Sequence, residues 1–458
     1  MDLNAQELVS DVRSAFDRGT TLPLAWRRQQ LRALLLMLEE QEQAFIDALG
    51  QDLRKSEFES YATEIGDVKA QAKQTLSNLR KWTKARPFNP GLMLMPATGA
   101  IVREPYGVAL IIAPWNYPVQ LALAPLIGAI AAGNAVIVKP SEMTPTVSRA
   151  LATHIPNYLD NEAIRVVEGG VDETTALLEQ RYDLIFYTGN GRVGRIVARA
   201  AAEHLTPTVL ELGGKSPVFI DGTVDLATAA DRIAWGKFTN AGQTCVAPDY
   251  ILATDDIAPE FERHLVESVR RMFGDDPHES PDYGRIVNDA HVERLSGLLS
   301  SGRTVLGGTV DAADRYIAPT IVADIHGDDA VMQDEIFGPI LPIITVRNAD
   351  EAIMFIRERD KPLALYAFTE DQTTRRKFVK WTSSGTLAFG VTVAQLASHT
   401  MPFGGVGESG MGKYHGEHSV MAFSHERPVV EKPLHPDTLM AMYPPVSEKR
   451  MGVLRKLM

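Results

Sequence analysis

Residues 107–142 decide the fold, and they read GVALIIAPWNYPVQLALAPLIGAIAAGNAVIVKPSE. Within them, Val108–Ala113 is a short apolar run, as expected of a strand that is buried on both faces. Val119–Ala132 is a longer apolar stretch that stops at Gly133-Asn134, a typical helix C-terminus. Ala135–Val138 is a second buried strand. The segment therefore predicts strand, loop, helix and strand, which is the repeating unit of a parallel sheet.

This apolar segment is not predicted to cross a membrane. A spanning helix needs about 20 consecutive, predominantly apolar residues. Here the stretch is interrupted by polar or helix-breaking residues at Pro114, Asn116, Pro118, Gln120, Pro125 and Asn134. We therefore expect no integral membrane segment in it.

On the N-terminal side, the chain is mostly helical. Residues 5–85 have helical periodicity, and one face of a charged helix presents Leu31, Leu34, Leu35 and Leu38. Pro87-Phe-Asn-Pro90 ends this region, and residues 93–105 predict short strands around Pro96-Ala-Thr-Gly99.

On the C-terminal side, strands and helices keep alternating. Further strands are predicted at Arg165–Glu168 and Asp183–Tyr187, and a helix at Arg195–His204. A second α/β stretch runs from Thr208 to Gly405, with helices predicted near residues 225–240, 256–272, 288–301, 348–359 and 371–383. This alternation predicts an α/β fold with a doubly wound parallel sheet, whose ligands bind at the carboxyl ends of the strands.

Composition narrows the class of protein. A chain of 458 residues suggests two or three domains. Its 58 acidic and 46 basic residues give a net charge of −12, which opposes nucleic-acid binding. The N-terminus lacks the basic start and apolar run of a signal peptide, and one cysteine suits a reducing compartment, so we expect a cytoplasmic protein. The basic tail Pro444–Met458 predicts a surface or subunit contact, because membrane association needs a larger apolar face or a second anchor.

The lone cysteine, Cys245, lies in Phe238-Thr-Asn-Ala-Gly-Gln-Thr-Cys-Val-Ala-Pro248. It cannot form an intramolecular disulfide and is a poor start for a metal site. Two interpretations remain, a buried filler or a reactive thiol. The glycine, glutamine and threonine before it favour the reactive thiol, since a core element would set it among regularly spaced apolar residues.

Two polar segments follow the first two buried strands. Asn116 comes after Val108–Ala113, and its amide either donates to a developing oxyanion or caps the helix that starts near Pro118. Lys139-Pro-Ser-Glu142 follows the second strand. Its lysine and glutamate either hold ribose hydroxyls or form a solvated turn.

A third segment, Gly189-Asn-Gly-Arg-Val-Gly194, spells GxGxxG between a predicted strand and a helix, the context of a dinucleotide-binding loop. A literal interpretation assigns the ribose to Glu211, 17 residues later. Glu211 is flanked by apolar residues and paired glycines, so a raised pKa and a general-base role are an alternative, and a structural carboxylate is another. A second match, Gly405–Gly410, has no clear preceding strand and predicts a tight chain crossing.

Taken together, these segments resemble the aldehyde dehydrogenase superfamily over nearly the whole chain. Its motifs occur in its order as Pro114-Trp-Asn116, Lys139-Pro-Ser-Glu142, Leu210-Glu-Leu-Gly-Gly-Lys-Ser216, Gly242-Gln-Thr-Cys245 and Glu335-Ile-Phe-Gly-Pro339. Other stretches are similar to the class 3 branch of fatty, aromatic and coniferyl aldehyde dehydrogenases, among them His204-Leu-Thr-Pro207, Ile233–Phe238, Cys245–Tyr250, Tyr283–Ile286, Lys361–Ala364 and Gly404–Gly412.

The resemblance implies a role for each segment. It makes Cys245 the nucleophile, Glu211 the general base and Asn116 an oxyanion donor, so the literal assignment of Glu211 to the ribose is set aside. It implies NAD or NADP as cofactor, with the ribose held by Lys139 and Glu142 and, on the nicotinamide side, by Glu335. The other implied cofactor contacts are Ile112, Ala113, Pro114, Trp115, Pro140, Ser141, Gly170, Thr188, Gly189, Asn190, Val193, Gly194, Leu212, Gly213 and Phe337.

The implied reaction oxidises an aliphatic or aromatic aldehyde to the carboxylic acid through a thiohemiacetal and a thioester on Cys245. An acylating relative would pass the thioester to coenzyme A, and Glu211 argues against that. A catalytically silent homologue with a structural or binding role is the alternative from another class, and the intact Cys245, Glu211 and Asn116 argue against it. His415-Gly-Glu-His418 is an isolated pair, so we expect no metal.

The resemblance also implies an architecture and an oligomer. It predicts a dinucleotide-binding domain from residues 1–85 and 107–207, a catalytic domain from 208–405, and bridging or oligomerisation segments with the tail from 86–106 and 406–458. The strands near 93–105 and the return segment Ala422–Lys432 would form a small bridging sheet in a homodimer. The carboxylate of Glu142 favours NAD by repelling a 2′-phosphate, although class 3 relatives with this glutamate resemble dual-specificity enzymes.

One segment departs from the family. Where relatives carry valine, asparagine and aspartate, this chain has Ala388-Phe-Gly-Val391, so the family asparagine aligns with Gly390. A class 3 histidine aligns with Gln395. This segment lines the substrate side in relatives, so the departure bears on which aldehyde is preferred, and the change at Gly390 removes a polar contact.

Overall fold

The computed structural model describes residues 3–457. Its first large sheet has six strands in the order β17-β7-β6-β3-β4-β5. The parallel strands are β3 Val108–Ile112, β4 Ala135–Lys139, β5 Ile164–Val166, β6 Leu184–Thr188 and β7 Thr208–Glu211. All residues of β3, β4 and β6 are buried, as in a sheet covered by helices on both faces. The predicted doubly wound sheet is confirmed.

The helices that connect these strands begin and end close to the predicted positions. They are α6 Gln120–Ala132, α7 Pro145–Tyr158, α8 Val171–Leu178 and α9 Gly191–Glu203. Gly133 ends α6 with a left-handed φ of 98°. The prediction that a helix starts at Arg195 is wrong, because α9 already begins at Gly191. There the Asn190 side chain caps it by accepting the amide of Val193.

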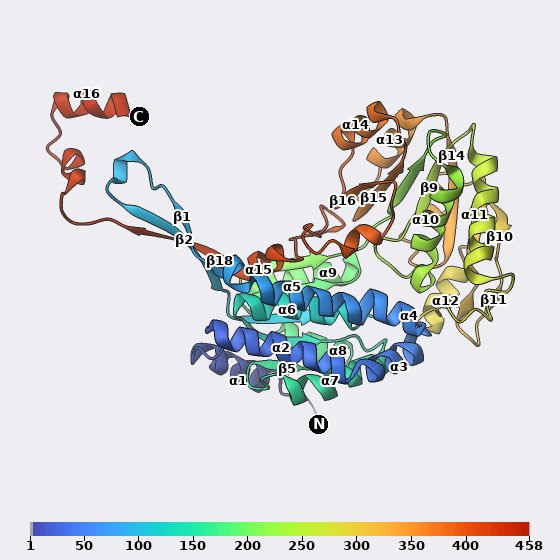
Figure 1. The fold of residues 1–458 in the computed structure, drawn as a ribbon, viewed down its shortest axis with the longest axis horizontal. Coiled ribbons are helices and arrows are strands. Elements are labelled where there is room, and N and C mark those ends of the chain that lie inside the picture. The colour runs from blue at the N-terminus through green and yellow to red at the C-terminus, as the bar shows by residue number, and fades with distance from the viewer. Residues whose placement is uncertain (1–2, 458) are drawn as a thin grey trace.

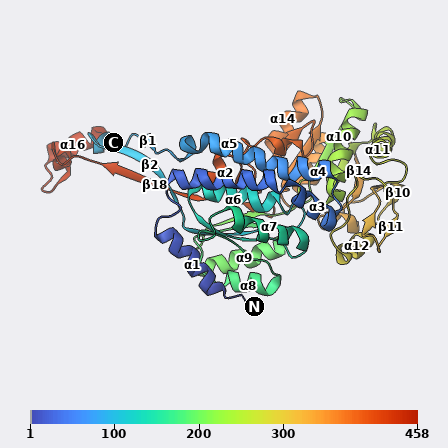
Figure 2. The same ribbon diagram turned by 60° about the horizontal axis from the view of Figure 1, so that its bottom comes forward.

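The N-terminal helical region is confirmed, and most of its helices form a layer over α6 and α7 instead of lying directly on the first sheet (Figures 1 and 2). Its elements are α1 Ala5–Asp17, α2 Leu24–Glu40, α3 Glu42–Leu53, α4 Glu57–Ser60, the π-helical turn η1 Tyr61–Ile65 and α5 Gly66–Thr83. Helix α2 lies against α5 and α6. Of its predicted apolar face, Leu31, Leu34 and Leu38 are fully buried and Leu35 is half-buried.

The second large sheet has seven strands in the order β10-β13-β14-β9-β8-β15-β16. Its strands are β8 Pro217–Ile220, β9 Tyr250–Thr254, β10 Arg303–Leu306, β13 Thr320–Ala323, β14 Ile340–Val346, β15 Ala364–Phe368 and β16 Thr386–Phe389. Its helices are α10 Leu226–Phe238, α11 Ala258–Phe273, α12 Asp289–Ser296, α13 Ala349–Arg357 and α14 Gln372–Trp381. The prediction for 288–301 is too long, since α12 ends before Gly297. A two-stranded hairpin, β11 Val310–Asp311 and β12 Tyr316–Ile317, lies beside this sheet.

A third, three-stranded antiparallel sheet projects away from the body, and we call it the arm (Figure 1). It consists of β1 Arg86–Phe88, β2 Thr98–Pro105 and β18 Ser424–Glu431, in the order β1-β2-β18. The predicted pairing of the return segment with this region is confirmed, since Ser424 lies opposite Pro105 and Glu431 opposite Thr98. The strand prediction for 93–97 is wrong, because Leu92–Leu94 forms the 3₁₀ turn η2. Beyond the arm lie η6 Thr438–Met442 and α16 Glu448–Leu457.

Two predicted segment boundaries need correction. Strand β7, which we placed in the second domain, pairs with β6, so the chain leaves the first sheet between Glu211 and Pro217. The short strand β17 Gly410–Met411, which we placed with the bridging segments, pairs antiparallel with β7. Both short strands are held by backbone hydrogen bonds to partners distant in sequence, which local periodicity does not report.

Within residues 3–457, no helix is both long enough and apolar enough to span a bilayer. Helix α6, which the apolar segment 107–142 forms, has only 13 residues. A span requires about 20.

Candidate active site

Cys245 follows a tight turn at the end of α10. Asn240 and Ala241 have left-handed backbone, with φ of 53° and 50°, and Gly242 follows with φ of 74°. A Cβ at Gly242 would lie 2.3 Å from the carbonyl oxygen of Gly338, so only glycine fits there. The turn carries the chain out of the helix and leaves Cys245 half-buried on a loop.

Gln243 holds this turn in place. Gln243 is fully buried, and its Nε2 donates to the carbonyls of Asn240 at 3.0 Å and Arg285 at 2.9 Å. Its Oε1 accepts the amide of Val287 at 3.0 Å. Gln243 therefore links the turn by hydrogen bonds to the neighbouring loop that contains Arg285 and Val287.

Two tyrosine hydroxyls hold the residues on either side of Cys245. The Tyr117 hydroxyl lies 2.7 Å from Thr244 Oγ1. The Tyr366 hydroxyl donates to the carbonyl of Val246 at 2.6 Å. Because Tyr117 belongs to the first large sheet's loop and Tyr366 to β15, the thiol is fixed relative to both sheets.

Asn116 reaches the nucleophile turn directly. It is 3% exposed, and its Nδ2 donates to the carbonyl of Gln243 at 3.0 Å. The alternative role as a helix cap is wrong, because α6 begins at Gln120 and Glu64 Oε2 accepts the amides of Val119 and Gln120. One N–H of the Asn116 amide remains beyond the bond to Gln243 and is available to a further acceptor.

Glu211 ends β7 and is 2% exposed. Neither carboxylate oxygen has a hydrogen-bond partner among residues 3–457. Burial raises the pKa of Glu211 well above its usual 4.5, as predicted from its apolar neighbours. A buried, unpartnered carboxyl group is costly to fold, and such costs concentrate at functional sites.

The thiol lies within the electrostatic reach of this carboxylate. The pKa of Cys245 is raised first by burial and then by the negative charges of Glu335 and Glu211. The pKa of Tyr414 is raised by burial and then by Glu211 and Cys245. These charge effects indicate that Glu211, Cys245 and Tyr414 lie near one another, and the thiol with its raised pKa needs a proton acceptor before it can act as a nucleophile.

The carboxyl ends of the parallel strands gather the other predicted residues. Ile112, at the end of β3, lies opposite Lys139 on β4 and Tyr187 on β6, and Thr188 lies opposite Glu211. With neighbouring strands about 4.8 Å apart, Lys139 and Glu211 are roughly 14 Å apart across the sheet. This separation is compatible with the separate roles that the resemblance implies for them.

Lys139 is 2% exposed, and its Nζ lies 3.0 Å from Glu142 Oε2. The alternative that this segment is simply a solvated turn is wrong for the lysine, while the Glu142 side chain is half exposed at 49%. Pro140 and Ser141 between them are buried. Gly170 lies beside this pair, since a Cβ there would meet the Glu142 side chain at 3.9 Å.

The loop 189–194 joins β6 to α9. The amide of Gly189 donates to the carbonyl of Glu211 at 2.9 Å, and a Cβ at Gly189 would lie 2.2 Å from the Tyr187 hydroxyl. A Cβ at Gly194 would lie 2.7 Å from Leu212. The glycines of this motif therefore let β6 and the Glu211 segment pack closely. The motif also contains the first residue of α9, Gly191.

Glu335 lies on the other side of the site. A Cβ at Gly213 would lie 1.9 Å from Glu335 Oε2, so this glycine makes room for the carboxylate. Burial, and then the charge of Asp249, raise the pKa of Glu335 to about 8. Nearby, the rings of Trp115 and Phe337 meet edge to face at 5.2 Å.

These residues fit a nicotinamide dinucleotide. A buried lysine paired with a half-exposed glutamate is suited to hydroxyl groups, and the Thr188 hydroxyl is buried without a partner among the described residues. Of the other predicted contacts, Ala113, Pro114 and Trp115 continue from β3, while Asn190 and Val193 form the cap of α9. All of them belong to the carboxyl edge of the sheet or to loops beside it, where such folds bind ligands.

The second glycine motif packs against the general-base candidate. A Cβ at Gly405 would lie 2.0 Å from the carbonyl of Ser409, and one at Gly410 would lie 2.1 Å from the carbonyl of Leu210. Gly410 is the residue opposite Glu211 in the β17–β7 pair. The predicted tight chain crossing is confirmed.

The backbone at Gly390 accommodates either the glycine of this chain or the asparagine of relatives. Its φ is 68°, a left-handed value that glycine and asparagine both tolerate. Its carbonyl accepts a bond from Arg232 Nη1 at 2.5 Å. Gln395 donates through Nε2 to the Tyr366 hydroxyl at 3.1 Å, while its Oε1 is buried without a partner among the described residues. The segment thus contacts the loop that holds Cys245 through Tyr366.

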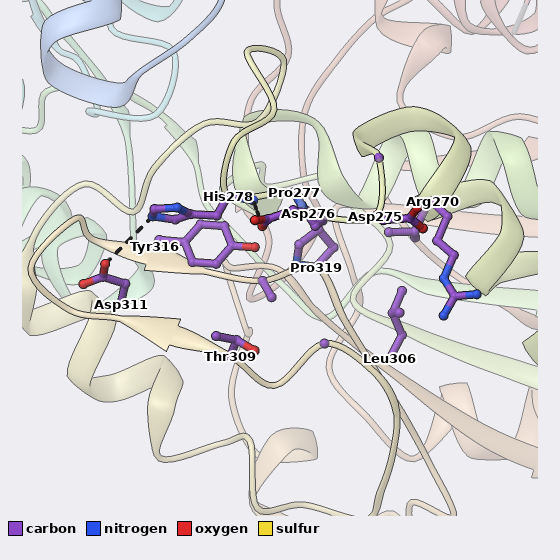
Figure 3. A pocket seen from close by; sticks show the side chains of 14 residues that line it. Arg270, Asp275, Asp276, Pro277, His278, Leu306, Thr309, Asp311, Tyr316 and Pro319 are labelled. Carbon is purple, nitrogen blue, oxygen red and sulfur yellow. Dashed lines mark hydrogen bonds and ion pairs between the residues drawn. The ribbon is translucent and has the colours of Figure 1, made fainter.

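A separate cavity of about 640 Å³ lies at the outer end of the second sheet (Figure 3). Figure 3 shows Asp311 and His278 facing each other beside Tyr316, with Arg270 and Leu306 farther along. None of the residues that the sequence singled out lines it. Among the described residues, no group of three or more His, Cys, Asp or Glu side chains could hold a metal ion.

Comparison with known proteins places this site in a family. The sequence profile described as "Aldehyde dehydrogenase family" matches residues 3–429. The chain belongs to the aldehyde dehydrogenase family. Its members oxidise aldehydes with NAD or NADP, and so does this enzyme.

Individual relatives support the class 3 branch. The chain is 48% identical over 444 residues to aldehyde dehydrogenase family 3 member A2 of Pongo abelii, covering 97% of this chain and 92% of that protein. It is 46% identical over 440 residues to a dimeric, NADP-preferring aldehyde dehydrogenase of Canis lupus familiaris, covering 96% and 97%. A substrate-bound state of AldH from Staphylococcus aureus is 43% identical, with a TM-score of 0.97 over 100% of this chain and 99% of that one.

Sequence reasoning missed residues that position this site. Lys215 Nζ binds Asp249 at 2.5 Å and the carbonyls of Val331 and Asp334 at 2.9 and 2.8 Å, which anchors the loop that carries Glu335. Its position in the Leu-Glu-Leu-Gly-Gly-Lys-Ser segment was the available signal. Lys237 is fully buried, and burial lowers its pKa to about 8. It lies in the Ile233–Phe238 stretch that resembles the class 3 branch, and that resemblance was the available signal.

Proposed function

We propose that Cys245, Glu211 and Asn116 are the catalytic residues of this enzyme, and that it oxidises aldehydes to carboxylic acids through a thioester. The observation that carries the proposal is the Glu211 carboxyl group, which is 2% exposed, unpartnered among the described residues and close enough to Cys245 to raise its pKa. A carboxyl with a raised pKa is poised to take a proton near neutral pH.

In the first step, the Cys245 thiolate adds to the aldehyde carbon, and the carbonyl electron pair moves to oxygen. The Asn116 Nδ2–H and the Cys245 backbone N–H donate to this oxyanion. When bound, a nicotinamide cofactor would supply the hydride acceptor for the same carbon, and the oxyanion then re-forms a carbonyl, which leaves a thioester on Cys245. Glu211 takes a proton from the water that attacks this carbonyl. The carbon–sulfur bond then breaks, the acid is released, and the electron pair stays on Cys245 as the thiolate.

Either NAD or NADP is proposed as cofactor, held by Lys139 and Glu142 at one ribose and by Glu335 on the nicotinamide side. The Glu142 carboxylate disfavours a 2′-phosphate through charge repulsion. Its contact with Lys139 at 3.0 Å and its half-exposed position leave it free to turn aside. The NADP-preferring relative from Canis lupus familiaris is consistent with use of both cofactors.

We further propose a homodimer in the cytoplasm. The arm projects from the body (Figure 2), and β18 is an edge strand with one side unpaired among the residues that the structure describes. The relative from Canis lupus familiaris is described as dimeric. Light scattering on the purified chain should give twice the monomer mass. A monomer at micromolar concentration would contradict the dimer without affecting the catalytic proposal.

The proposed chemistry is tested by NADH or NADPH fluorescence with hexanal and benzaldehyde. Turnover with either aldehyde, abolished by iodoacetamide, is expected, because Cys245 is the one cysteine in the chain. Lack of reduction with every aldehyde would favour a silent homologue. Release of product only when coenzyme A is present would favour an acylating enzyme.

A further inference from the structure

A buried ion pair lies behind the Asn116 loop, outside the residues to which the proposed mechanism assigns a role. Lys55 Nζ and Glu64 Oε1 are 2.5 Å apart, and both side chains are 0% exposed. Removing two charges from water is costly, and the attraction between them rarely returns more than that cost. A fully buried pair is therefore weak evidence for stability, and its other contacts indicate a different role.

Both ions direct their remaining hydrogen bonds to one short stretch, residues 116–120. Lys55 Nζ donates to the carbonyl of Asn116 at 2.9 Å. Glu64 Oε2 accepts the amides of Val119 at 2.8 Å and Gln120 at 3.2 Å. The ammonium group also lies 4.0 Å from the centre of the Tyr117 ring. The pair thus forms hydrogen bonds to the backbone at both ends of the loop that carries the proposed oxyanion donor.

The local backbone is shaped to bring these two side chains together. Lys55 follows Arg54, which ends α3 in a left-handed conformation with φ of 53°. Glu64 lies on the π-helical turn Tyr61–Ile65, a type of turn that is rare and frequent at functional sites. A Cβ at Gly66 would lie 2.8 Å from the carbonyl of Tyr61, so the turn is followed by a residue without a side chain.

The same carbonyl of Asn116 is also held from the nucleophile side. Asn240 Nδ2 donates to it at 2.8 Å and to the carbonyl of Gln243 at 3.2 Å. The Asn116 side chain donates to the carbonyl of Gln243 at 3.0 Å. Lys55 on one side and the nucleophile turn on the other therefore fix the backbone and the amide of Asn116 together.

We propose that the Lys55–Glu64 ion pair is the positioning device for Asn116, setting where its amide meets the oxyanion. This inference rests on the proposed role of Asn116 as the oxyanion donor. Lys55 and Glu64 are positioning residues, since their bonds go to the backbone of the loop and not to the reacting atoms. Loss of the pair lets the amide shift, and a displacement of about 1 Å at a reacting centre costs on the order of 100-fold in rate.

The test replaces the pair by neutral side chains of similar size, Lys55→Met with Glu64→Gln. A single Lys55→Met change would leave a buried carboxylate without a counter-charge and unfold the protein, whereas the glutamine introduced by Glu64→Gln still accepts an amide bond through its oxygen. The control is Lys69→Met with Glu42→Gln, which removes an ion pair of the same helical layer between a buried lysine and a glutamate that is 38% exposed. The Lys69 ammonium group has Glu42 as its hydrogen-bond partner and makes no hydrogen bond to residues 116–120 among the described residues.

Single-turnover cofactor reduction and steady-state kinetics are measured for the wild type, the Asn116→Ala variant, the pair variant, their combination and the control. We expect the pair variant to lower kcat by about 10- to 100-fold with little change in KM, and to cost almost nothing further in the Asn116→Ala background. The rate of Cys245 alkylation by iodoacetamide and the thermal unfolding profile should stay close to those of the control.

The outcomes separate the two proposals. If Asn116→Ala leaves kcat unchanged, the oxyanion role fails, and the positioning role fails with it. If Asn116→Ala lowers kcat while the pair variant does not, only the positioning role is overturned. An equal loss from the pair variant in both backgrounds would also overturn it, because a residue that acts through Asn116 cannot matter once that amide is gone.

Discussion

Replacement of Glu211 by glutamine should slow the enzyme and stabilise its fold at the same time. The carboxyl group is 2% exposed and has no hydrogen-bond partner among residues 3–457. Burial raises its pKa well above the usual 4.5. Folding therefore disfavours the charged form, and the native state loses stability as pH rises above 4.5 until it reaches the folded pKa.

The size of the effect follows from that interval. Each pH unit between the unfolded pKa and the folded pKa, or the working pH if that is lower, costs about 1.4 kcal/mol. Between 4.5 and pH 7 the cost is at most about 3.5 kcal/mol. Glutamine keeps the shape but cannot ionise, so Glu211→Gln should raise the free energy of unfolding at pH 7 by roughly 1–3 kcal/mol. The gain should shrink to near zero at the acid end, where the wild-type carboxyl is protonated in both states.

The kinetic effect runs in the opposite direction. A general base contributes about 10²–10⁴-fold to its step, so hydrolysis of the thioester should slow by that factor. The first turnover should still reduce the cofactor, and a rapid burst of about one equivalent per active site should precede a slow steady state.

The assay combines stopped-flow NADH fluorescence with urea unfolding at several pH values. Glu408→Gln is the matched control, since Glu408 lies on the glycine loop before β17 but is 52% exposed and paired with Arg195. Neither its burst nor its stability should differ from the wild type. The reasoning about Glu211 is refuted by unchanged steady-state turnover, or by a loss of stability that is the same at every pH.

Three further changes test other parts of the site. Gly242→Ala should destabilise the protein by more than about 1 kcal/mol and abolish turnover, because φ is 74° and the added Cβ would meet the Gly338 carbonyl at 2.3 Å. Thermal unfolding followed by circular dichroism and an activity assay measure these two effects, and a melting curve like that of the wild type would contradict the prediction. Glu142→Ala should raise the ratio of kcat/KM for NADP to that for NAD by removing a negative charge, and an unchanged ratio would place the 2′-phosphate elsewhere. Gly390→Asn should cost less than about 1 kcal/mol, since asparagine tolerates the φ of 68° and the nearest atom to an added Cβ is 3.8 Å away, while the preference between hexanal and benzaldehyde shifts; a collapse of stability would refute the conformational account.

The parts of the fold that depend on local pattern were predictable. Val108–Ile112 and Ala135–Lys139 are strands because continuous apolar runs must be covered on both faces, and Gly133 ends α6 because its φ of 98° suits glycine. The predicted start of α9 at Arg195 is wrong because the Asn190 side chain caps the helix, so that it begins at Gly191 within the glycine motif.

The parts that depend on contacts between distant segments were not predictable from periodicity. Strand β17 exists because Gly410 meets Glu211 on β7. The positions of Cys245, Glu211 and Asn116 came from family motifs, and the structure adds that Gln243 and Asn116 are bonded together. The Lys55–Glu64 pair had no signal, since a lysine and a glutamate nine positions apart are ordinary on a surface helix.

The arm has a consequence for the order in which the molecule is completed. Arg86 of β1 is ion-paired with Glu426 of β18, a separation of 340 residues. Contacts between residues so far apart in the sequence form late in folding, because the intervening chain must first be brought together. During synthesis, β18 leaves the ribosome after every strand of both large sheets, so β1 and β2 wait as an unfinished two-stranded ribbon. Two-stranded ribbons are marginally stable by themselves. The arm is therefore completed only after residues 424–431 have been made, and a chain that stops before β18 lacks one of the three strands of the arm.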